Sequence, residues 1–275
     1  MEYSPIKFKE KMEKYNFNLK KIYGQNFIID ENIINSIIEK SNIDKDTLVI
    51  EVGPGAGSLT YKLGKYAGEV IAYEIDTSLK ELLSDNISQL NNVKVIYEDF
   101  LKSNIKSVIK EYSYKKIYLV ANLPYYITTP IILKVIEDEL FIDKMVVMVQ
   151  KEVGDRFKAR PGSKDYSSLS VYLNYYYDVK KVLDVSKNVF IPKPNVDSIV
   201  VEFKKKESLK YLKDKNVLFK LVRDSFKQKR KTLKNNLRDY DLSKIEKILE
   251  KYNMDLSIRA EQIPIDIFID ISNNL

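Results

Sequence analysis

The stretch TLVIEVGPGAG at residues 47–57 joins an apolar run rich in β-branched residues to a glycine-rich loop. A helical pattern follows, and EVIAYE at residues 69–74 has the composition of a second strand. Similar runs are VKVIY (93–97), IYLVAN (117–122) and KMVVMV (144–149), with segments of helical spacing such as 77–90 and 130–139 between most of them. This alternation predicts an α/β protein with a mainly parallel, doubly wound sheet. Thr77 or Ser78 is expected to cap the helix over 77–90.

The pattern of the chain changes after Phe203, at the end of the predicted sheet. Two further β-rich segments, LSVYLNYYY (169–177) and DSIVVEF (197–203), are expected to extend the sheet. After Phe203 a charged stretch without clear periodicity begins, and from about residue 216 the pattern is helical. We therefore predict a cofactor-binding α/β domain over residues 1–203 and a small all-α domain over residues 204–275.

Composition restricts the chemistry. The 275 residues include no cysteine, which excludes disulfides and thiolate metal sites, and no histidine, which excludes histidine-based triads, general bases and zinc ligands. Any reaction must therefore use carboxylates, amides, hydroxyls and backbone groups, and we expect no metal. No apolar run approaches the roughly 20 residues that cross a bilayer. No signal peptide is recognisable either, so we expect a cytoplasmic protein without a membrane partner.

Positive charge is concentrated in one part of the chain. The net charge is +7, yet residues 180–240 alone contain 18 Lys or Arg against 7 Asp or Glu. Such asymmetry is typical of a segment that contacts a polyanion, and a solvated lysine-rich face is the alternative. We expect Phe226 and Leu233 to anchor a helix whose basic side chains reach phosphate groups. The densest basic cluster on it comprises Lys227, Lys229, Arg230 and Lys231.

The glycine loop and two acidic residues predict a nucleoside site. A dinucleotide fingerprint would need glycine at position 58, where this chain has Ser58. Glu74 ends the second strand, where a carboxylate can bind ribose hydroxyls, and Asp99 follows the third strand as a candidate acceptor for an adenine amino group. Both residues and Gly53 follow carboxyl ends of strands, where open α/β sheets bind ligands. Taken alone, Asp99 is better explained as a helix N-cap or an ordinary turn residue.

The segment Asn122-Leu123-Pro124-Tyr125 follows the fourth strand and is the most specific motif. The exocyclic nitrogen of adenine is a poor nucleophile because its lone pair is delocalised into the ring. The Asn122 side-chain oxygen and a backbone carbonyl of the Leu-Pro step can hold its two N–H bonds, since both are hydrogen-bond acceptors. The nitrogen would then become more tetrahedral and direct its lone pair at a sulfonium methyl. Tyr125 can stack on the base.

These motifs together resemble those of the ribosomal RNA adenine dimethyltransferase family. In chain order they are KIYGQNF (21–27), EVGPGAG (51–57), Glu74, EDF (98–100), NLPY (122–125), FIPKPNVDS (190–198) and QKRKTL (228–233). VQKEV (149–153), RPGSKDYSSLSV (160–171) and the spelling NLPY most resemble the small-subunit (16S) branch. The resemblance covers the chain from about residue 20 to its end. It implies a Rossmann-like class I methyltransferase sheet followed by a small helical domain.

The resemblance also implies site residues. The S-adenosylmethionine site would comprise Asn26 and Ile28 over the methionine part, Gly53 through its backbone, Glu74 on the ribose, Asp99 on the adenine, and Asn122 between cofactor and substrate. Tyr125 and Phe190 would sandwich the flipped target base. Phe190 taken alone is as well explained as a buried aromatic residue ahead of a proline turn.

The implied reaction is S-adenosylmethionine-dependent dimethylation of two adjacent adenosines in the 3′-terminal hairpin of small-subunit rRNA. The partner would be that rRNA within a pre-ribosomal particle, and the enzyme would be a monomer. One alternative is a large-subunit (23S) rRNA dimethyltransferase of macrolide resistance, which shares the catalytic motifs. Another is a non-catalytic ribosome assembly factor. A nicotinamide-dependent dehydrogenase is disfavoured by Ser58 and by the absence of histidine.

Overall fold

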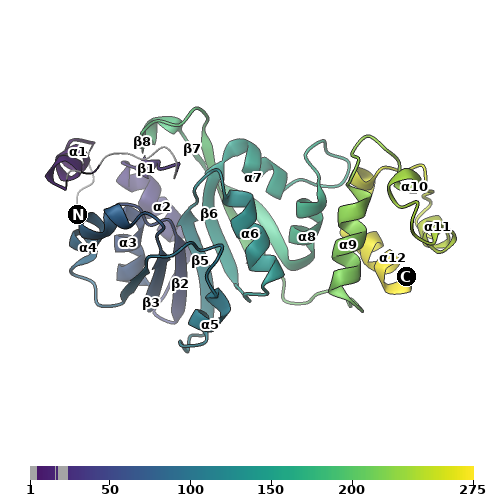
Figure 1. Cartoon of the computed structure of the whole chain (residues 1–275), viewed down its shortest axis with the longest axis horizontal. Helices are drawn as coiled ribbons and strands as arrows, with labels where there is room; N and C mark the ends of the chain where they lie inside the picture. The colour runs from purple at the N-terminus through teal and green to yellow at the C-terminus, as the bar shows by residue number, and fades with distance from the viewer. Residues whose placement is uncertain (1–4, 16, 18–23) are drawn as a thin grey trace. The chain divides into compact units, whose positions relative to one another are not determined.

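The computed structural model describes residues 5–15, 17 and 24–275 (Figure 1). The chain forms two compact units. The first contains the described residues up to Gly154 together with Lys180–Lys204, and the second contains Asp155–Val179 and Lys205–Leu275. The chain passes from the first unit to the second twice, and the second passage, after Lys204, lies next to the predicted boundary at residue 203. The sequence did not predict that residues 155–179 belong with the C-terminal helices.

A seven-stranded sheet with the order β4-β3-β2-β5-β6-β9-β7 forms the framework of the first unit. Its strands are β2 (Thr47–Val52), β3 (Glu69–Tyr73), β4 (Val93–Ile96), β5 (Lys116–Asn122), β6 (Lys144–Gln150), β7 (Tyr177–Val185) and β9 (Ser198–Lys205). Neighbouring strands from β4 to β6 are parallel, and β9 runs antiparallel to β6. The predicted α/β fold with a mainly parallel sheet is confirmed.

Helices cover both faces of this sheet. They are α2 (Glu31–Ser41), α3 (Ser58–Tyr66), α4 (Lys80–Ile87), α5 (Ile105–Ile109), α6 (Thr128–Glu137) and α7 (Lys151–Phe157). Helix α1 (Pro5–Lys14) is not one of them, and its Phe8 ring packs against the Phe27 ring. From β2 the chain adds β3 and β4 on one side, and it then crosses back to add β5 and β6 on the other side of β2. Because crossovers between parallel strands are right-handed, this reversal puts α3 and α4 on one face of the sheet and α5 and α6 on the other. A short antiparallel pair, β1 (Phe27–Ile28) and β8 (Phe190–Ile191), stands apart from the sheet.

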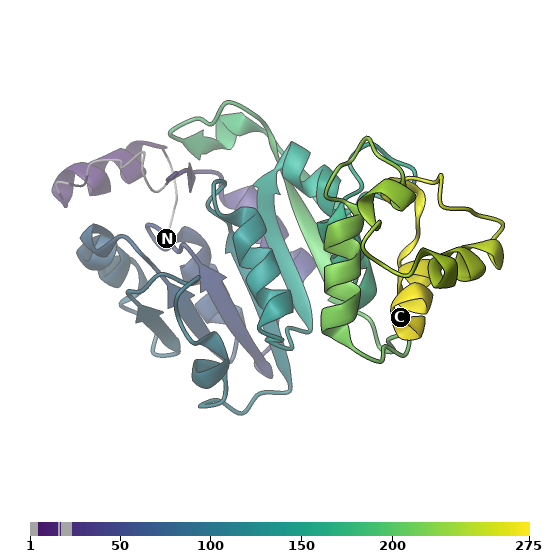
Figure 2. The same cartoon turned by 45° about the vertical axis from the view of Figure 1, so that its right-hand side comes forward.

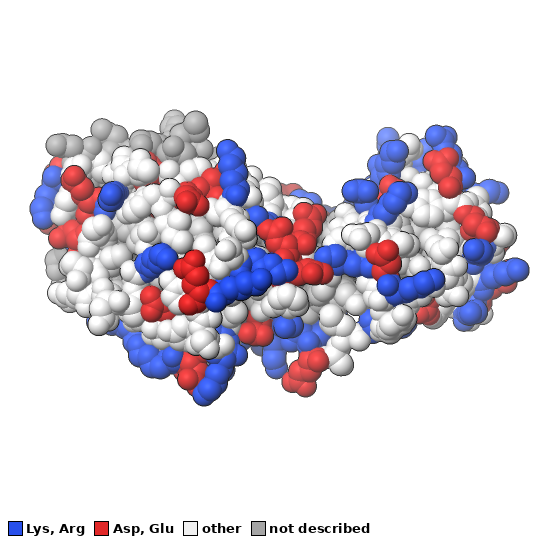
Figure 3. Space-filling model, turned by 60° about the horizontal axis from the view of Figure 1, so that its bottom comes forward, with Lys and Arg blue, Asp and Glu red and all other residues white. Residues whose placement is uncertain are grey.

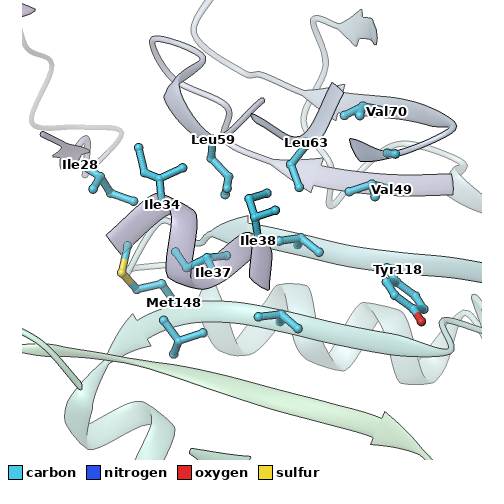
Figure 4. Packing of buried hydrophobic residues seen from close by; sticks show 14 of the residues in the cluster. Ile28, Ile34, Ile37, Ile38, Val49, Leu59, Leu63, Val70, Tyr118 and Met148 are labelled. Atoms are coloured by element: carbon cyan, nitrogen blue, oxygen red, sulfur yellow. The ribbon is translucent and has the colours of Figure 1, made fainter. Parts of the chain in front are cut away.

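The core forms where helix α2 meets the sheet. The Asp30 side chain caps this helix by accepting the Asn32 N–H at 2.9 Å. Positions three and four residues apart then share one face, which is buried. Figure 4 shows that face, Ile34, Ile37 and Ile38, together with the residues around it, Leu59, Leu63, Val49 and Met148. All six residues of β2 are buried, because helices cover both of its faces.

Two local predictions were wrong. Most of the segment 169–177 is helix α8 (Ser168–Tyr176), and the strand β7 begins only at Tyr177. The start of this helix is fixed by the Ser167 N–H, which donates to Ser170 Oγ at 3.2 Å. The apolar side chains that suggested a strand are buried on the surface of this helix instead. Ahead of α4, the 3₁₀ turn Thr77–Leu79 is capped by Asp76, which accepts the Ser78 N–H at 3.1 Å, so the cap precedes both predicted residues.

The second unit is helical. Its helices are α8, α9 (Lys215–Ser225), α10 (Leu233–Asn236), α11 (Leu242–Glu250) and α12 (Ile265–Asn274). Helices α9 and α12 lie side by side (Figure 2), and α8 packs against both. Phe226, directly after α9, contacts the Phe268 ring at a centroid distance of 6.3 Å and the Tyr166 ring at 6.0 Å. The predicted helical character of the region beyond residue 215 is confirmed.

Candidate active site

A cavity lies at the carboxyl ends of β2, β3 and β5, where the strand order changes direction. Open α/β sheets bind ligands at such switch points. Residues from 24–28, 51–59, 73–79, 98–100 and 122–127 line it. They include every residue predicted to bind the cofactor, Asn26, Ile28, Gly53, Glu74, Asp99 and Asn122, together with Leu123, Pro124 and Tyr125. The structure therefore brings nine of the predicted site residues to one place.

The glycine loop forms one wall by close backbone approach. Gly53 and Gly55 have positive φ angles of 73° and 59°, which L side chains rarely adopt. A Cβ on Gly53 would lie 3.3 Å from Pro124 Cγ, and one on Gly55 would lie 2.9 Å from the Phe27 ring. The loop thus packs directly against both the NLPY segment and β1, and only glycine fits at Gly55.

Glu74 is held at the end of β3 by backbone hydrogen bonds. Its Oε2 accepts the Gly55 N–H at 3.0 Å, and its Oε1 accepts the Asp76 N–H at 2.8 Å. The side chain is only 5% exposed. Burial raises the pKa of this carboxyl, and the two backbone donors oppose that rise because they favour the charged form. The carboxyl is thus fixed to the glycine loop and still lines the cavity.

Glu51 is a cavity residue that the sequence analysis did not single out. It lies on β2, is 1% exposed, and its Oε2 has no hydrogen-bond partner among the described residues. Burial raises its pKa to about 8, because an ionised carboxylate is poorly solvated there. The signal was available, since Glu51 is the one acidic residue in the strand TLVIEV.

The amide of Asn122 is oriented by a hydrogen bond to a backbone carbonyl. Its Nδ2–H donates to the Asn26 backbone carbonyl at 2.9 Å, and the Asn26 side chain donates to the Gly24 carbonyl at 2.9 Å. A carbonyl can only accept, so the amide nitrogen of Asn122 must face Asn26 and its Oδ1 must face elsewhere. That Oδ1 is buried without a partner in the described part of the chain. An unpaired buried acceptor costs about 1–3 kcal/mol, so its retention favours a ligand that donates to it.

The rest of the NLPY segment is also fixed. The Tyr125 hydroxyl and Ser198 Oγ on β9 are 2.7 Å apart, and burial raises the pKa of the Tyr125 phenol. The Pro124 carbonyl accepts the Ile127 N–H at 3.2 Å and the Thr128 hydroxyl at 3.1 Å. Because the Pro124 carbonyl is used in this way, the Leu123 carbonyl is the better backbone acceptor for a substrate.

Asp99 combines a local structural contact with a place on the cavity. Its Oδ1 accepts the Leu101 N–H at 2.9 Å, as expected of a turn residue. Its Oδ2 lies 3.9 Å from the Lys102 ammonium. Asp99 and its neighbours Glu98 and Phe100 all line the cavity. One carboxyl oxygen is therefore committed to the turn, and the other is the candidate ligand acceptor.

Phe190 does not line the cavity. It is 2% exposed and belongs to the apolar cluster that contains Ile28 and Val185. On β8 it is paired with Ile28 of β1, so the two strands hold it inside. The sequence left two roles open for Phe190, stacking on the target base or packing in the core, and in this structure its ring packs in the core. A sandwich with Tyr125 would require the ring to leave this cluster.

The basic cluster is not helical, contrary to the prediction. Helix α9 ends at Ser225 and α10 begins at Leu233, and all five residues from Lys227 to Lys231 are exposed. The Asn236 side chain stops the helix, because it donates to the Ser225 carbonyl at 2.8 Å and accepts the Gln228 N–H at 3.1 Å. Leu233 is buried as expected, but it belongs to the next helix. The basic side chains thus project from a loop.

Among the described residues, no group of three or more acidic side chains is arranged to hold a metal ion. No described helix is long and apolar enough to span a membrane.

Comparisons with known proteins agree with this geometry. The family profile "Ribosomal RNA adenine dimethylase" matches residues 16–275. Ribosomal RNA small subunit methyltransferase A of Staphylococcus aureus (strain bovine RF122 / ET3-1) is 50% identical over 240 residues, which are 86% of this chain and 81% of the relative. The protein of strain Newman gives the same values.

Solved structures support the same assignment. A dimethyladenosine transferase from Plasmodium falciparum aligns with a TM-score of 0.75 and 27% identity, covering 89% of this chain and 95% of that one. The 23S rRNA methyltransferase ErmE aligns with a TM-score of 0.69 over 90% and 99% of the two chains, and its 24% identity supports the fold alone. The chain therefore belongs to the ribosomal RNA adenine dimethylase family.

Proposed function

We propose that the chain transfers methyl groups from S-adenosylmethionine to the exocyclic amino groups of two adjacent adenosines in the 3′-terminal hairpin of 16S rRNA. Membership of the family and 50% identity to proteins named small subunit methyltransferase A support the substrate class. The observation that carries the proposal is the buried, unpartnered Oδ1 of Asn122 on the cavity. It is an acceptor without a protein partner in the described part of the chain, which suits a ligand that donates an N–H to the cavity wall.

The cavity residues fit S-adenosylmethionine. Gly53 and Gly55 carry no side chain, and an added Cβ would meet Pro124 or Phe27. Because no side chain covers the loop, a ligand can approach the backbone of Gly53 closely. Glu74 has lone pairs left on both fixed oxygens and would accept hydrogen bonds from ribose hydroxyls, and Asp99 Oδ2 would accept from the adenine amino group. Asn26 and Ile28 would cover the methionine part. The bound cofactor supplies an electrophilic methyl group on a positively charged sulfur.

The protein's own groups would activate the amine. Asn122 Oδ1 and the Leu123 carbonyl would each accept one N–H of the adenine amino group, which draws the nitrogen out of conjugation with the ring. The lone pair is then directed away from both acceptors and towards the methyl group. Alignment of this kind contributes up to about 7–11 kcal/mol in ideal cases. After transfer the nitrogen is cationic and acidic, so its proton can leave to water without a general base.

Tyr125 would position the base. Its hydroxyl is anchored to Ser198, so the ring is held at the cavity wall, where it can stack on a flipped adenine.

The second unit would dock the RNA through its phosphates, with Lys227, Arg230 and Lys231 among the contacts. We further propose that the enzyme is a monomer and acts in the cytoplasm on a pre-ribosomal particle.

Transfer of tritiated methyl groups to purified ribosomal subunits from undermethylated cells tests this function. We expect label in the small subunit, mapped to two adjacent dimethyladenosines of the 3′-terminal hairpin. Label in the large subunit instead would support the 23S alternative. Binding to small subunits without label, in a preparation that binds S-adenosylhomocysteine, would support an assembly factor. A thermal shift with NAD rather than with S-adenosylmethionine would support a dehydrogenase.

A further inference from the structure

The second unit carries a basic loop that the catalytic motifs do not explain. Residues 160–164, Arg-Pro-Gly-Ser-Lys, connect α7 to α8, and both Arg160 and Lys164 are exposed. The loop is fastened in place. The Gly162 N–H donates to the Glu261 carbonyl at 2.7 Å, and the buried Tyr166 donates its hydroxyl to the Ile263 carbonyl at 3.2 Å. The loop is thus a fixed feature of the unit.

This loop and the basic cluster lie next to each other. The Lys229 ammonium donates to the Lys164 backbone carbonyl, so the two segments touch across 65 positions of sequence. Beneath them the Tyr166 ring meets the Phe226 ring edge to face at 6.0 Å. Six cations are therefore gathered on one unit: Arg160, Lys164, Lys227, Lys229, Arg230 and Lys231.

These cations are not neutralised by neighbouring carboxylates. None of the six forms an ion pair within the described ranges 5–15, 17 and 24–275. In the same unit Lys158, Lys210 and Lys220 each lie within 3.0 Å of an aspartate oxygen. Figure 3 shows one face of the surface, on which Lys and Arg side chains stand interspersed with Asp and Glu. Unpaired charges on a fixed scaffold are suited to a polyanion.

The tip of the loop also allows close approach. Gly162 has a φ of 86°, and nothing lies within 4 Å of the position that a Cβ would occupy. A substrate chain can therefore lie against the backbone between Arg160 and Lys164, which are four residues apart. Phosphates of adjacent nucleotides, rather than a single ion, match a surface made of two such segments.

We propose that residues 160–164 and 227–231 form one two-part surface that binds consecutive phosphates of the rRNA backbone. In this surface Arg160, Lys164, Lys227, Arg230 and Lys231 contact phosphates. Lys229 is a positioning residue, because its ammonium is used to hold the two loops together. The inference rests on the proposed function for the identity of the RNA and adds a contact region that the sequence motifs left without a role.

Binding to a fluorescent 3′-terminal hairpin of small-subunit rRNA, measured at several salt concentrations, tests the surface. The double variant Arg160→Gln/Lys164→Gln should bind the hairpin about 25- to 60-fold more weakly at 0.1 M salt and flatten the slope of log K against log salt by about 1.4–1.8, for two lost contacts. Its affinity for S-adenosylhomocysteine should be unchanged. The matched control Lys244→Gln/Lys247→Gln removes the same charge from exposed positions of α11 and should change the slope little.

Equal slopes for the wild type and the loop variant would overturn the proposal, as would equal losses in the loop variant and the α11 control. Competition by polyglutamate as effective as that by RNA would indicate an acidic protein partner and would overturn it too. Lys229→Met should weaken binding in the wild-type chain but not in the loop variant, because the residue acts through the loop. Methyl transfer by the wild type is measured in the same preparations. Loss of transfer with normal RNA binding would count against the proposed function and not against this surface.

Discussion

Replacing Asn122 with alanine separates activation of the amine from binding. The change removes the unpartnered Oδ1 and the hydrogen bond from Nδ2 to the Asn26 carbonyl. For folding, loss of that bond costs about 0.5–1.5 kcal/mol, and removal of a buried unpaired acceptor returns about 1–3 kcal/mol. The two contributions offset each other, so we expect a folded variant with nearly unchanged stability.

The effect on turnover should be large. As the nitrogen becomes cationic, its hydrogen bond to Oδ1 becomes a bond to a charged group, worth about 1.5–3 kcal/mol. At 1.36 kcal/mol per tenfold change, kcat should fall about 10- to 150-fold from this bond alone, and loss of alignment would add to the fall. The loss should appear in kcat rather than in KM, because the interaction strengthens only as the methyl group is transferred.

Three measurements on the purified variant decide the question. Single-turnover transfer of tritiated methyl groups gives the rate, calorimetric titration with S-adenosylhomocysteine gives cofactor affinity, and thermal unfolding gives stability. Ser198→Ala serves as a control, since it changes a partner of the same segment while leaving every proposed acceptor in place. An Asn122→Ala enzyme that turns over within about twofold of the wild type would refute the proposed role of the Oδ1.

Three further outcomes are expected. Glu74→Gln should weaken S-adenosylhomocysteine binding about 10- to 150-fold by calorimetry, because it removes a charged acceptor worth about 1.5–3 kcal/mol; unchanged affinity would make Glu74 purely structural. Burial holds Glu51 protonated up to about pH 8, so its contribution to stability is complete below its ordinary pKa and is lost as the pH rises towards 8, at about 1.4 kcal/mol per pH unit. Chemical unfolding from pH 5 to 8 should therefore show a decline in the wild type that Glu51→Gln reduces, and parallel curves would contradict this. Gly55→Ala should lower the unfolding free energy by about 1–3 kcal/mol, since its Cβ would meet the Phe27 ring at 2.9 Å in a left-handed conformation; a variant as stable as the wild type would show that the loop relaxes freely.

The parts of the fold predicted correctly are those where one local pattern determines one structure. The strand TLVIEV is buried on both faces and is followed by glycines with positive φ, so its end and the turn after it could be read from the sequence. The segment LSVYLNYYY is different. A short, continuous apolar run fits a buried strand or a buried helix equally well, and here a pair of serines at its start decides for the helix.

The sequence predicted which side chains gather at the cavity, apart from Glu51 and Phe190, but not the backbone contacts that hold them. Residues that follow carboxyl ends of parallel strands must meet at one edge of the sheet, which is why Gly53, Glu74 and Asn122 could be placed together. Whether a side chain faces the cavity or the core depends on packing from distant segments. Phe190 is inside because β8 pairs with β1, a contact between residues more than 160 positions apart. The basic cluster leaves the helical path because Asn236, beyond it in the chain, binds the end of α9.

The segment 24–28 shows most clearly what a sequence motif leaves out. Its Phe27 ring packs on Gly55, and its Asn26 carbonyl fixes the amide of Asn122, so one short segment contacts both the glycine loop and the NLPY segment. The second contact uses a backbone oxygen, which every residue type possesses, so the identity of residue 26 does not reveal this contact in the sequence. Yet this oxygen determines which way the Asn122 amide points, and therefore whether an acceptor or a donor faces the substrate. The acceptor needed to activate an adenine amine is specified jointly by a side chain on β5 and a carbonyl 96 residues earlier.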